Sequence, residues 1–377
     1  MSVYALGVGM TRFTQQPDRS PQMLGAAAGA AAMADAGLRR EQVGALFCGS
    51  VFGGIGIGQL IARELGMSRL PVVNLENACA SSGVALRNAI AWVASGGVET
   101  ALVIGVEQLT ARGPGLVKSD SQGPSEQLGL TLPGLYAMHA QRYLAESGGA
   151  VEDLALVAVK NRGNGAMNPD AHFQAAVTVE QVLESPMIAT PLTRLQCCPS
   201  VDGAAAVAIS SARSAGDSPA ARGIAITGWG MVSGNALDVP GSEPEATRLA
   251  GDLAYEVAGV GPDDIDVAEL HEPFTIAELE HCESLGFAAR GEALNRLREG
   301  SFALDGNVAV NPSGGLLSRG HPLGASGAAQ IVEIVRQLRG DAADRQVPGA
   351  RIGLAHIMGG NITEIDSSAC TVHVLCA

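Results

Sequence analysis

Short apolar runs alternate with helical patterns of small residues through the first hundred positions of the chain. The apolar runs have the length of buried strands, and segments 21–36, 58–65 and 80–95 between them have the length of helices. Strands and helices that alternate in this way form layered α/β folds, in which helices cover a largely parallel sheet. We therefore predict an α/β fold.

The same pattern occurs again in the second half of the chain. Residues 36–46, AGLRREQVGAL, align without gaps with residues 258–268, AGVGPDDIDVA, and VVN at 72–74 corresponds to AVN at 309–311. A duplicated βαβαβ unit, whose second copy begins near residue 220, explains both correspondences. Chance similarity is the alternative, because turns from helix to strand commonly use Gly and acidic residues.

The alternation is lost between residues 112 and 196, where Pro, Gly, Asn and Gln are frequent. An insertion of this length is usually a functional lid or loop domain. We therefore divide the chain into an N-terminal half (1–111 with 197–218), a loop domain (112–196) and a C-terminal half (219–377).

Charge and cysteine spacing exclude several classes of partner. A formal net charge of −14 repels nucleic acid and anionic membranes, so we expect neither as a partner. The seven cysteines show neither the spacing of a disulfide framework nor a C-x-x-C pair, and no signal peptide is recognisable. We expect a cytoplasmic protein. The cysteines and histidines also lack the spacing of zinc ligands, so no metal site is expected.

Cys79 lies in NACASSG, where a strand pattern changes into a helical one. If residues 80–95 form a helix, the thiol lies at its N-terminal end, where free N–H groups and the helix dipole favour the thiolate. Cys79 is therefore a candidate nucleophile. From the local sequence alone, a small buried apolar residue is an equally good interpretation.

Three histidines of the second half lie beside predicted strand ends: His271 in DVAELHEPF, His321 in SRGHPLGASG and His356 in GLAHIMGGN. Ligands of open α/β sheets bind where strand ends meet, so these side chains can converge although they are distant in sequence. One such histidine alone would more often be structural. Three of them in glycine-rich turns favour a functional site.

Four motifs in this order resemble those of the thiolases: NACASSG at 77–83, HEPF at 271–274, GHPLGASG at 320–327 and GLAHIMGG at 353–360. The similarity spans nearly the whole chain and is greatest to the sterol-carrier-protein type of thiolase and its bacterial relatives. The resemblance implies a five-layered α/β fold of two similar βαβαβ halves, with the loop domain over the cleft. It also implies at least a homodimer.

The resemblance further implies acyl-CoA or 3-ketoacyl-CoA substrates, with coenzyme A as substrate or product and no permanently bound cofactor. Cys79 would hold the acyl group, His321 would take its proton, and His271 with His321 would bind a thioester oxygen. Backbone N–H groups of Cys79 and of Gly359 or Gly360 would form a second oxyanion hole. Bacterial relatives often associate with a small OB-fold protein that carries a zinc ribbon, so such a partner is a further expectation.

Four basic residues in or near the insertion are candidates for contact with the coenzyme phosphates, although solvated surface charge is the default for each. They are Arg142, Lys160, Arg162 and Arg194.

One departure from the thiolase pattern concerns the second catalytic cysteine. Its two usual positions are occupied here by Met358 and Pro273, neither of which can carry a proton. We expect His356 to replace it as the base, with Glu272 as the alternative. Two other interpretations stay open: a ketosynthase-like or other unusual condensation without this cysteine, and a non-catalytic subunit of a complex.

Overall fold

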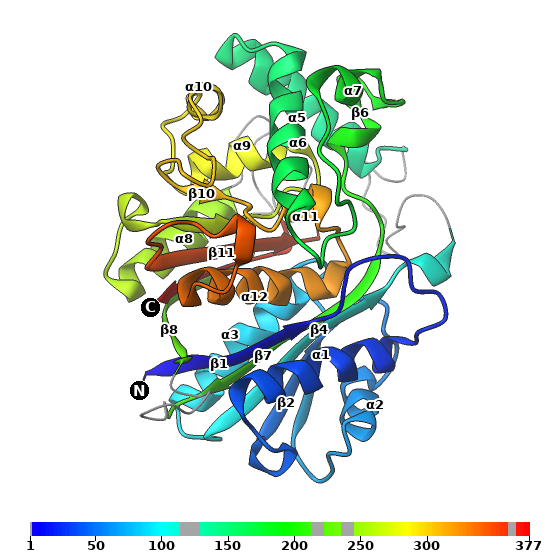
Figure 1. The fold of residues 1–377 in the computed structure, drawn as a ribbon, viewed down its shortest axis with the longest axis vertical. Helices are drawn as coiled ribbons and strands as arrows, with labels where there is room; N and C mark the ends of the chain where they lie inside the picture. The colour runs from blue at the N-terminus through cyan, green and yellow to red at the C-terminus, as the bar shows by residue number, and fades with distance from the viewer. Residues whose placement is uncertain (1, 114–128, 213–221, 235–244, 361–366) are drawn as a thin grey trace.

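The structure is a computed structural model that describes residues 2–113, 129–212, 222–234, 245–360 and 367–377. One ten-stranded sheet forms its centre, in the order β10-β9-β11-β12-β8-β1-β7-β4-β2-β3 (Figure 1). Strands from the two ends of the chain therefore lie in the same sheet. The predicted α/β fold is confirmed.

The N-terminal side of the sheet contains five strands and three helices. They are β1 (Val3–Met10), α1 (Pro21–Ala36), β2 (Ala45–Gly49), α2 (Ile57–Glu64), β3 (Val72–Leu75), α3 (Ser81–Ala94), β4 (Thr100–Gln108) and β7 (Asp202–Ser210). The C-terminal side repeats this order with β8 (Ile224–Val232), α8 (Glu245–Ala258), β9 (Val267–Glu269), β10 (Ala309–Val310), α12 (Ser326–Arg339), β11 (Ile352–Gly359) and β12 (Ala369–Cys376). The strand order is the same on both sides, so the predicted duplication is confirmed.

The aligned segments end their helices in the same way. Helix α1 ends at Ala36 and α8 at Ala258, and each is followed by a glycine in the left-handed region, Gly37 at φ 64° and Gly259 at φ 70°. Only glycine adopts this conformation without a steric penalty, and it lets the chain turn back toward the sheet. A short 3-10 helix and a strand follow in both copies.

The helices form three layers around the two sides of the sheet. Helices α3 and α12 pack against each other between the two sides, α1 and α2 cover the outer face of the N-terminal side, and α8 covers the outer face of the C-terminal side (Figure 1). The N-terminal and C-terminal parts of the sheet count as two further layers. Together they make the five layers that the resemblance to thiolases implies.

Glycines in the first strand of each copy allow a close approach of the covering helix. A Cβ atom on Gly7 or Gly9 of β1 would collide with the backbone of α1, and one on Gly228 or Gly230 of β8 would collide with the backbone of α8. Larger side chains would push each helix off the sheet. These four glycines therefore allow the same close helix packing in both copies.

Between β4 and β7 the chain forms helices α5 (Leu132–Ser147), α6 (Val151–Ala166) and α7 (Val179–Glu184), with a small hairpin of β5 (Met187–Ala189) and β6 (Leu192–Thr193). Helix α6 packs against α9 (Thr275–Ser284), α10 (Ala293–Arg298) and α11 (Gly315–Ser318) of the C-terminal side. The domain boundaries given above stay predictions.

Of the helices within the described ranges, none has both the length and the apolar character that crossing a membrane requires.

Candidate active site

The loop between β3 and α3 holds Cys79 two residues before the helix begins. Ala78 takes a positive φ of 48°, and the Ser81 hydroxyl accepts from the Asn77 N–H at 2.9 Å and donates to the Ala78 carbonyl at 2.5 Å. These bonds fold the loop tightly around Cys79. Helix α3 begins at Ser81, one residue later than the sequence predicts.

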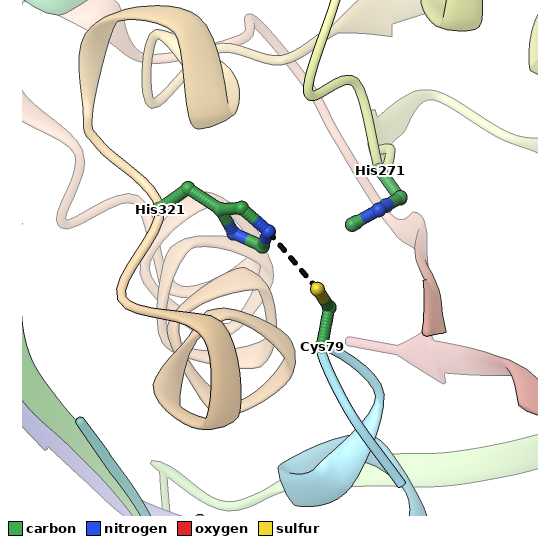
Figure 2. Close-up of side chains that lie close together, drawn as sticks. All are labelled: Cys79, His271 and His321. Atoms are coloured by element: carbon green, nitrogen blue, oxygen red, sulfur yellow. Dashed lines mark hydrogen bonds between the residues drawn. The ribbon is translucent and has the colours of Figure 1, made fainter. Parts of the chain in front are cut away.

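Figure 2 shows the Cys79 thiol between two imidazole rings that come from the other half of the chain. Nε2 of His321 lies 3.2 Å from Sγ of Cys79, and one donor atom from each of Cys79, His271 and His321 lies within 4.8 Å of the others. The rings of His271 and His321 are 5.3 Å apart at their centres. The structure thus brings His271 and His321 to Cys79, and their catalytic roles stay predictions.

A serine hydroxyl orients the His321 ring. Nδ1 of His321 lies 2.8 Å from Oγ of Ser326, which itself donates to the Pro322 carbonyl at 3.4 Å. A hydroxyl that donates elsewhere accepts from Nδ1–H, so this pairing assigns the neutral tautomer with a lone pair on Nε2. That lone pair faces the sulfur and can take its proton.

Burial opposes charge on both members of this pair. It lowers the pKa of His321 to about 3, with a smaller effect from the Arg319 charge. It also raises the pKa of Cys79 to about 12, and the Glu107 carboxylate acts in the same direction. Both shifts oppose the expected resting thiolate and favour a thiol beside a neutral imidazole.

The end of β11 lies directly against the Cys79 loop. A Cβ atom on Gly359 would lie 2.6 Å from the backbone nitrogen of Cys79 and 2.5 Å from that of Ala80, which no side chain tolerates. Gly360 follows with φ 67°. The structure thus places Gly359 and Gly360 beside the Cys79 backbone, and their part in an oxyanion hole stays a prediction.

His356 does not reach the reacting centre as a base. It is completely buried in β11, where Nδ1 accepts from the His271 backbone N–H at 3.4 Å and Nε2 lies 3.1 Å from Oγ1 of Thr247. Both ring nitrogens are thus occupied by protein groups, and the prediction of a base at His356 is wrong. His356 accepts a hydrogen bond from the His271 backbone and so supports the loop that carries His271.

Glu272 is held by groups of α11 and α6. Its Oε1 accepts from the Leu317 N–H at 3.2 Å and from Nδ2 of Asn161 at 3.3 Å, which directs it toward α11 and α6. Burial and the neighbouring Glu278 and Glu269 raise its pKa well above the usual range. It belongs to a buried polar cluster, and the alternative of Glu272 as the base stays a prediction.

A thiol that the sequence analysis passed over lies next to Pro273. The Cys198 N–H donates to the Pro273 carbonyl at 2.9 Å, and the neighbouring Pro199 carbonyl accepts from the His321 N–H at 3.4 Å. Residues 198–199 therefore touch both loops that carry the imidazoles. In the sequence, only the adjacent pair Cys197–Cys198 ahead of β7 points to this position. Two adjacent cysteines do not have the spacing of zinc ligands, so the pair predicted no site.

The basic candidates for coenzyme phosphates fit unequally. The ammonium group of Lys160 is bonded to Asn161, Glu278 and the Val310 carbonyl, and Arg162 is bonded to the Ala175 carbonyl and stacked on Phe173. These protein partners disfavour phosphate binding at Lys160 and Arg162, which stays untested. Sequence could not show this, because their partners lie up to 150 residues away.

The other two basic candidates differ in their surroundings. Arg142 lines a cavity of about 240 Å³ together with Glu146, Glu280 and Glu283, and these carboxylates disfavour a phosphate there. Arg194 is exposed in the short helix η3 (Arg194–Gln196). It stays a candidate.

The comparisons with known proteins agree with this geometry. The family model Thiolase, N-terminal domain, matches residues 3–213, and Thiolase C-terminal domain-like matches residues 237–372. The acetyl-CoA acetyltransferase of Methanothermobacter thermautotrophicus is 40% identical over 370 residues, which cover 95% of this chain and 96% of the relative. The chain therefore belongs to the thiolase family, as its motifs indicated.

One further relative and one solved structure are also similar to this chain. The benzoylsuccinyl-CoA thiolase subunit BbsB of Thauera aromatica is 38% identical over 368 residues, which cover 95% of this chain and 94% of the relative. A solved structure described as an Ltp2-ChsH2(DUF35) aldolase superposes with a TM-score of 0.85 at 28% identity, and the match covers 100% of this chain and 98% of the other.

Proposed function

We propose that this protein is a thiolase-type acyltransferase that forms or cleaves a carbon–carbon bond beside a coenzyme A thioester through an acyl-Cys79 intermediate. The observation that carries the proposal is the 3.2 Å contact between Sγ of Cys79 and Nε2 of His321. Family membership and the name of the acetyl-CoA acetyltransferase relative support the substrate class.

In the proposed first step the sulfur attacks the thioester or ketone carbonyl as its proton moves to Nε2 of His321. This transfer avoids a free thiolate, which the buried site disfavours. The oxyanion that forms would accept from the backbone N–H groups of Cys79 and of Gly359 or Gly360. Donors fixed in a dry site stabilise such an oxyanion by about 3 kcal/mol each.

In the second step of a cleavage, the oxyanion would collapse, break the carbon–carbon bond and leave acyl-Cys79 and an enolate, which would take the proton that His321 received in the first step. The enolate oxygen would lie between His271 and His321, which face the sulfur from the C-terminal half, and condensation would run these steps in reverse. Either direction of the reaction passes through this enolate. The substrate would be an acyl-CoA or a 3-ketoacyl-CoA, and coenzyme A would enter or leave with it.

A condensation or cleavage that needs no second cysteine is the other candidate. Met358 is buried in β11 opposite Cys370, and Pro273 accepts a backbone bond from Cys198, so neither family position supplies a proton carrier. The similar structure named as an aldolase favours this variant. The subunit name of the Thauera relative also favours assembly with a partner protein, in addition to a homodimer.

The test is to incubate the protein with a panel of acyl-CoA and 3-ketoacyl-CoA thioesters and to measure the mass of each cysteine-containing peptide. We expect one acyl group on the Cys79 peptide, none in Cys79→Ala, and an unchanged adduct in the matched control Cys376→Ser. If no thioester acylates Cys79, with or without a co-expressed partner protein, the proposal is overturned in favour of a non-catalytic subunit.

A further inference from the structure

The residues of the candidate active site form a set of metal donors as well as a catalytic one. Cys79 offers a sulfur, and His271 and His321 each offer a ring nitrogen; the three donor atoms lie within 4.8 Å of one another. No two of these residues are near each other in sequence, which explains why ligand spacing gave no sign of them.

The two imidazoles are prepared differently for a ligand. The bond from Nδ1 of His321 to Oγ of Ser326 holds the ring with Nε2 toward the sulfur, and metal-binding histidines are commonly oriented by such a bond from their other ring nitrogen. Nδ1 of His271 is buried and has no hydrogen-bond partner within the described parts of the chain, and His271 itself is only 4% exposed. A buried ring nitrogen without a partner is uncommon, because its desolvation is then uncompensated.

The donor types restrict which cation fits. Two imidazoles and one thiol, with no carboxylate among them, match Zn²⁺ and similar thiophilic cations and not Mg²⁺ or Ca²⁺, which require oxygen ligands. In a tetrahedral zinc site, bond lengths of about 2.3 Å to sulfur and 2.0 Å to nitrogen put the donors about 3.5 Å apart. Cys79 and His321 already meet this spacing at 3.2 Å.

We propose that Cys79, His271 and His321 bind a thiophilic divalent cation such as Zn²⁺, and that the cation and the acyl group compete for the same sulfur. On binding, the S–H bond breaks, the sulfur electron pair binds the metal, and the proton leaves to solvent. No oxidant or reductant is needed. The proposed cation site does not depend on the proposed function. The predicted block of acyl transfer rests on it.

Co²⁺ is the probe for binding, since a tetrahedral Co²⁺ thiolate site has a charge-transfer absorption that Zn²⁺ then removes by displacement. We expect chelator-treated protein to bind one Co²⁺ per chain with this absorption. Cys79→Ser should lose the charge-transfer band, and His271→Ala should weaken binding about 10- to 100-fold. His172→Ala, a histidine outside the cluster, should leave the spectrum unchanged. Circular dichroism checks that each variant folds.

The second readout is alkylation. Zn²⁺ should protect the Cys79 peptide from iodoacetamide, and a chelator should restore labelling. The inference is overturned if no charge-transfer band forms, or if Cys79→Ser gives the same spectrum as the unaltered chain. The two proposals separate here: a Co²⁺ site without any acyl adduct refutes only the acyltransferase, and an acyl adduct that Zn²⁺ does not suppress refutes only the competition.

Discussion

The Ser326 hydroxyl decides which nitrogen of His321 faces the sulfur. Without it, the ring can rotate or change tautomer, and Nε2 no longer presents a lone pair to Cys79. Ser326 is buried and is unsuited to touch substrate itself, so it is a positioning residue.

We predict that Ser326→Ala slows acylation of Cys79 by about 10- to 100-fold, the usual effect of losing such a supporting bond, with little change in KM. Single-turnover mass spectrometry of the Cys79 peptide measures the rate. Ser318→Ala is the matched control, because Ser318 is also a buried serine that bonds a carbonyl, that of Phe173. Equal rates in both variants would contradict the orienting role.

Burial of the Cys79 sulfur predicts an unusual pH dependence of alkylation. Because the pKa of Cys79 is raised to about 12, the thiolate fraction increases about tenfold per pH unit throughout the neutral and alkaline range. Iodoacetamide labelling of the Cys79 peptide should therefore keep rising from pH 7 to pH 10. A plateau below pH 8 would show a thiolate at rest and would restore the helix-terminus explanation.

At the scale of elements, the contact between β11 and the Cys79 loop allows no side chain. Gly359→Ala places a methyl group against the nitrogens of Cys79 and Ala80, so we predict a destabilisation of about 1–3 kcal/mol and loss of the acyl adduct. Gly163→Ala in helix α6 is the control, because a Cβ atom there meets nothing within 4 Å. Urea unfolding and adduct mass test both variants.

Helix α8 is connected to the site through a chain of buried polar groups. The His271 N–H donates to Nδ1 of His356, so the proton of the neutral His356 ring is on Nε2. Nε2–H of His356 then donates to the Thr247 hydroxyl. This leaves the hydroxyl free to donate to Nδ1 of His281, which lies 3.2 Å away. A backbone N–H cannot accept, and this fixes the direction of the whole chain.

Thr247→Val removes the shared hydroxyl and leaves two buried imidazole nitrogens unpaired, at a cost of about 1–3 kcal/mol each. We predict lower stability together with slower acylation, because Thr247 no longer holds the His356 ring that accepts from the His271 N–H. Thr247→Ser should recover both. Acylation that stays normal in Thr247→Val, despite the lost stability, would limit this chain to a structural role.

The sequence predicted those features of the molecule that depend on local pattern and duplication. The segments 36–46 and 258–268, which align with each other, begin at the last residues of α1 and α8. The motifs around Cys79 and the histidines indicated a common site, and the structure has Cys79 in contact with His321. The raised pKa of the thiol and the partners of His356 and Lys160 were not predicted. Each depends on the depth of a group below the surface and on partners from distant segments, which local sequence does not contain.

At the scale of the whole molecule, several buried histidines make stability depend on pH. Burial lowers the pKa of His281 to about 4 and that of His373 to about 3. As pH falls below the ordinary value of about 6.5, the unfolded chain binds these protons and the folded chain does not, so stability is lost. Buried Glu107 and Glu272, with raised pKa values, act in the opposite direction.

His373→Gln isolates one such contribution far from the proposed chemistry. With a folded pKa of about 3, His373 should account for about 2 kcal/mol of the stability lost between pH 7.5 and pH 5. We therefore predict that the variant loses less stability over this interval than the unaltered chain, measured by urea unfolding at both pH values. Parallel losses would refute a neutral buried His373.

The two loops that face each other in the site occupy equivalent places in the two copies. Helices α3 and α12 both begin at a serine, Ser81 and Ser326, and Cys79 precedes the first helix as Gly324 precedes the second. On the proposed mechanism, one copy thus carries the nucleophile and the other its proton acceptor.

This division has a consequence for synthesis. The sulfur leaves the ribosome well before His271 and His321, so the nascent chain contains an ordinary, unassisted thiol. If Cys79 is acylated as proposed, His321 can assist it only after the second copy has closed against the first.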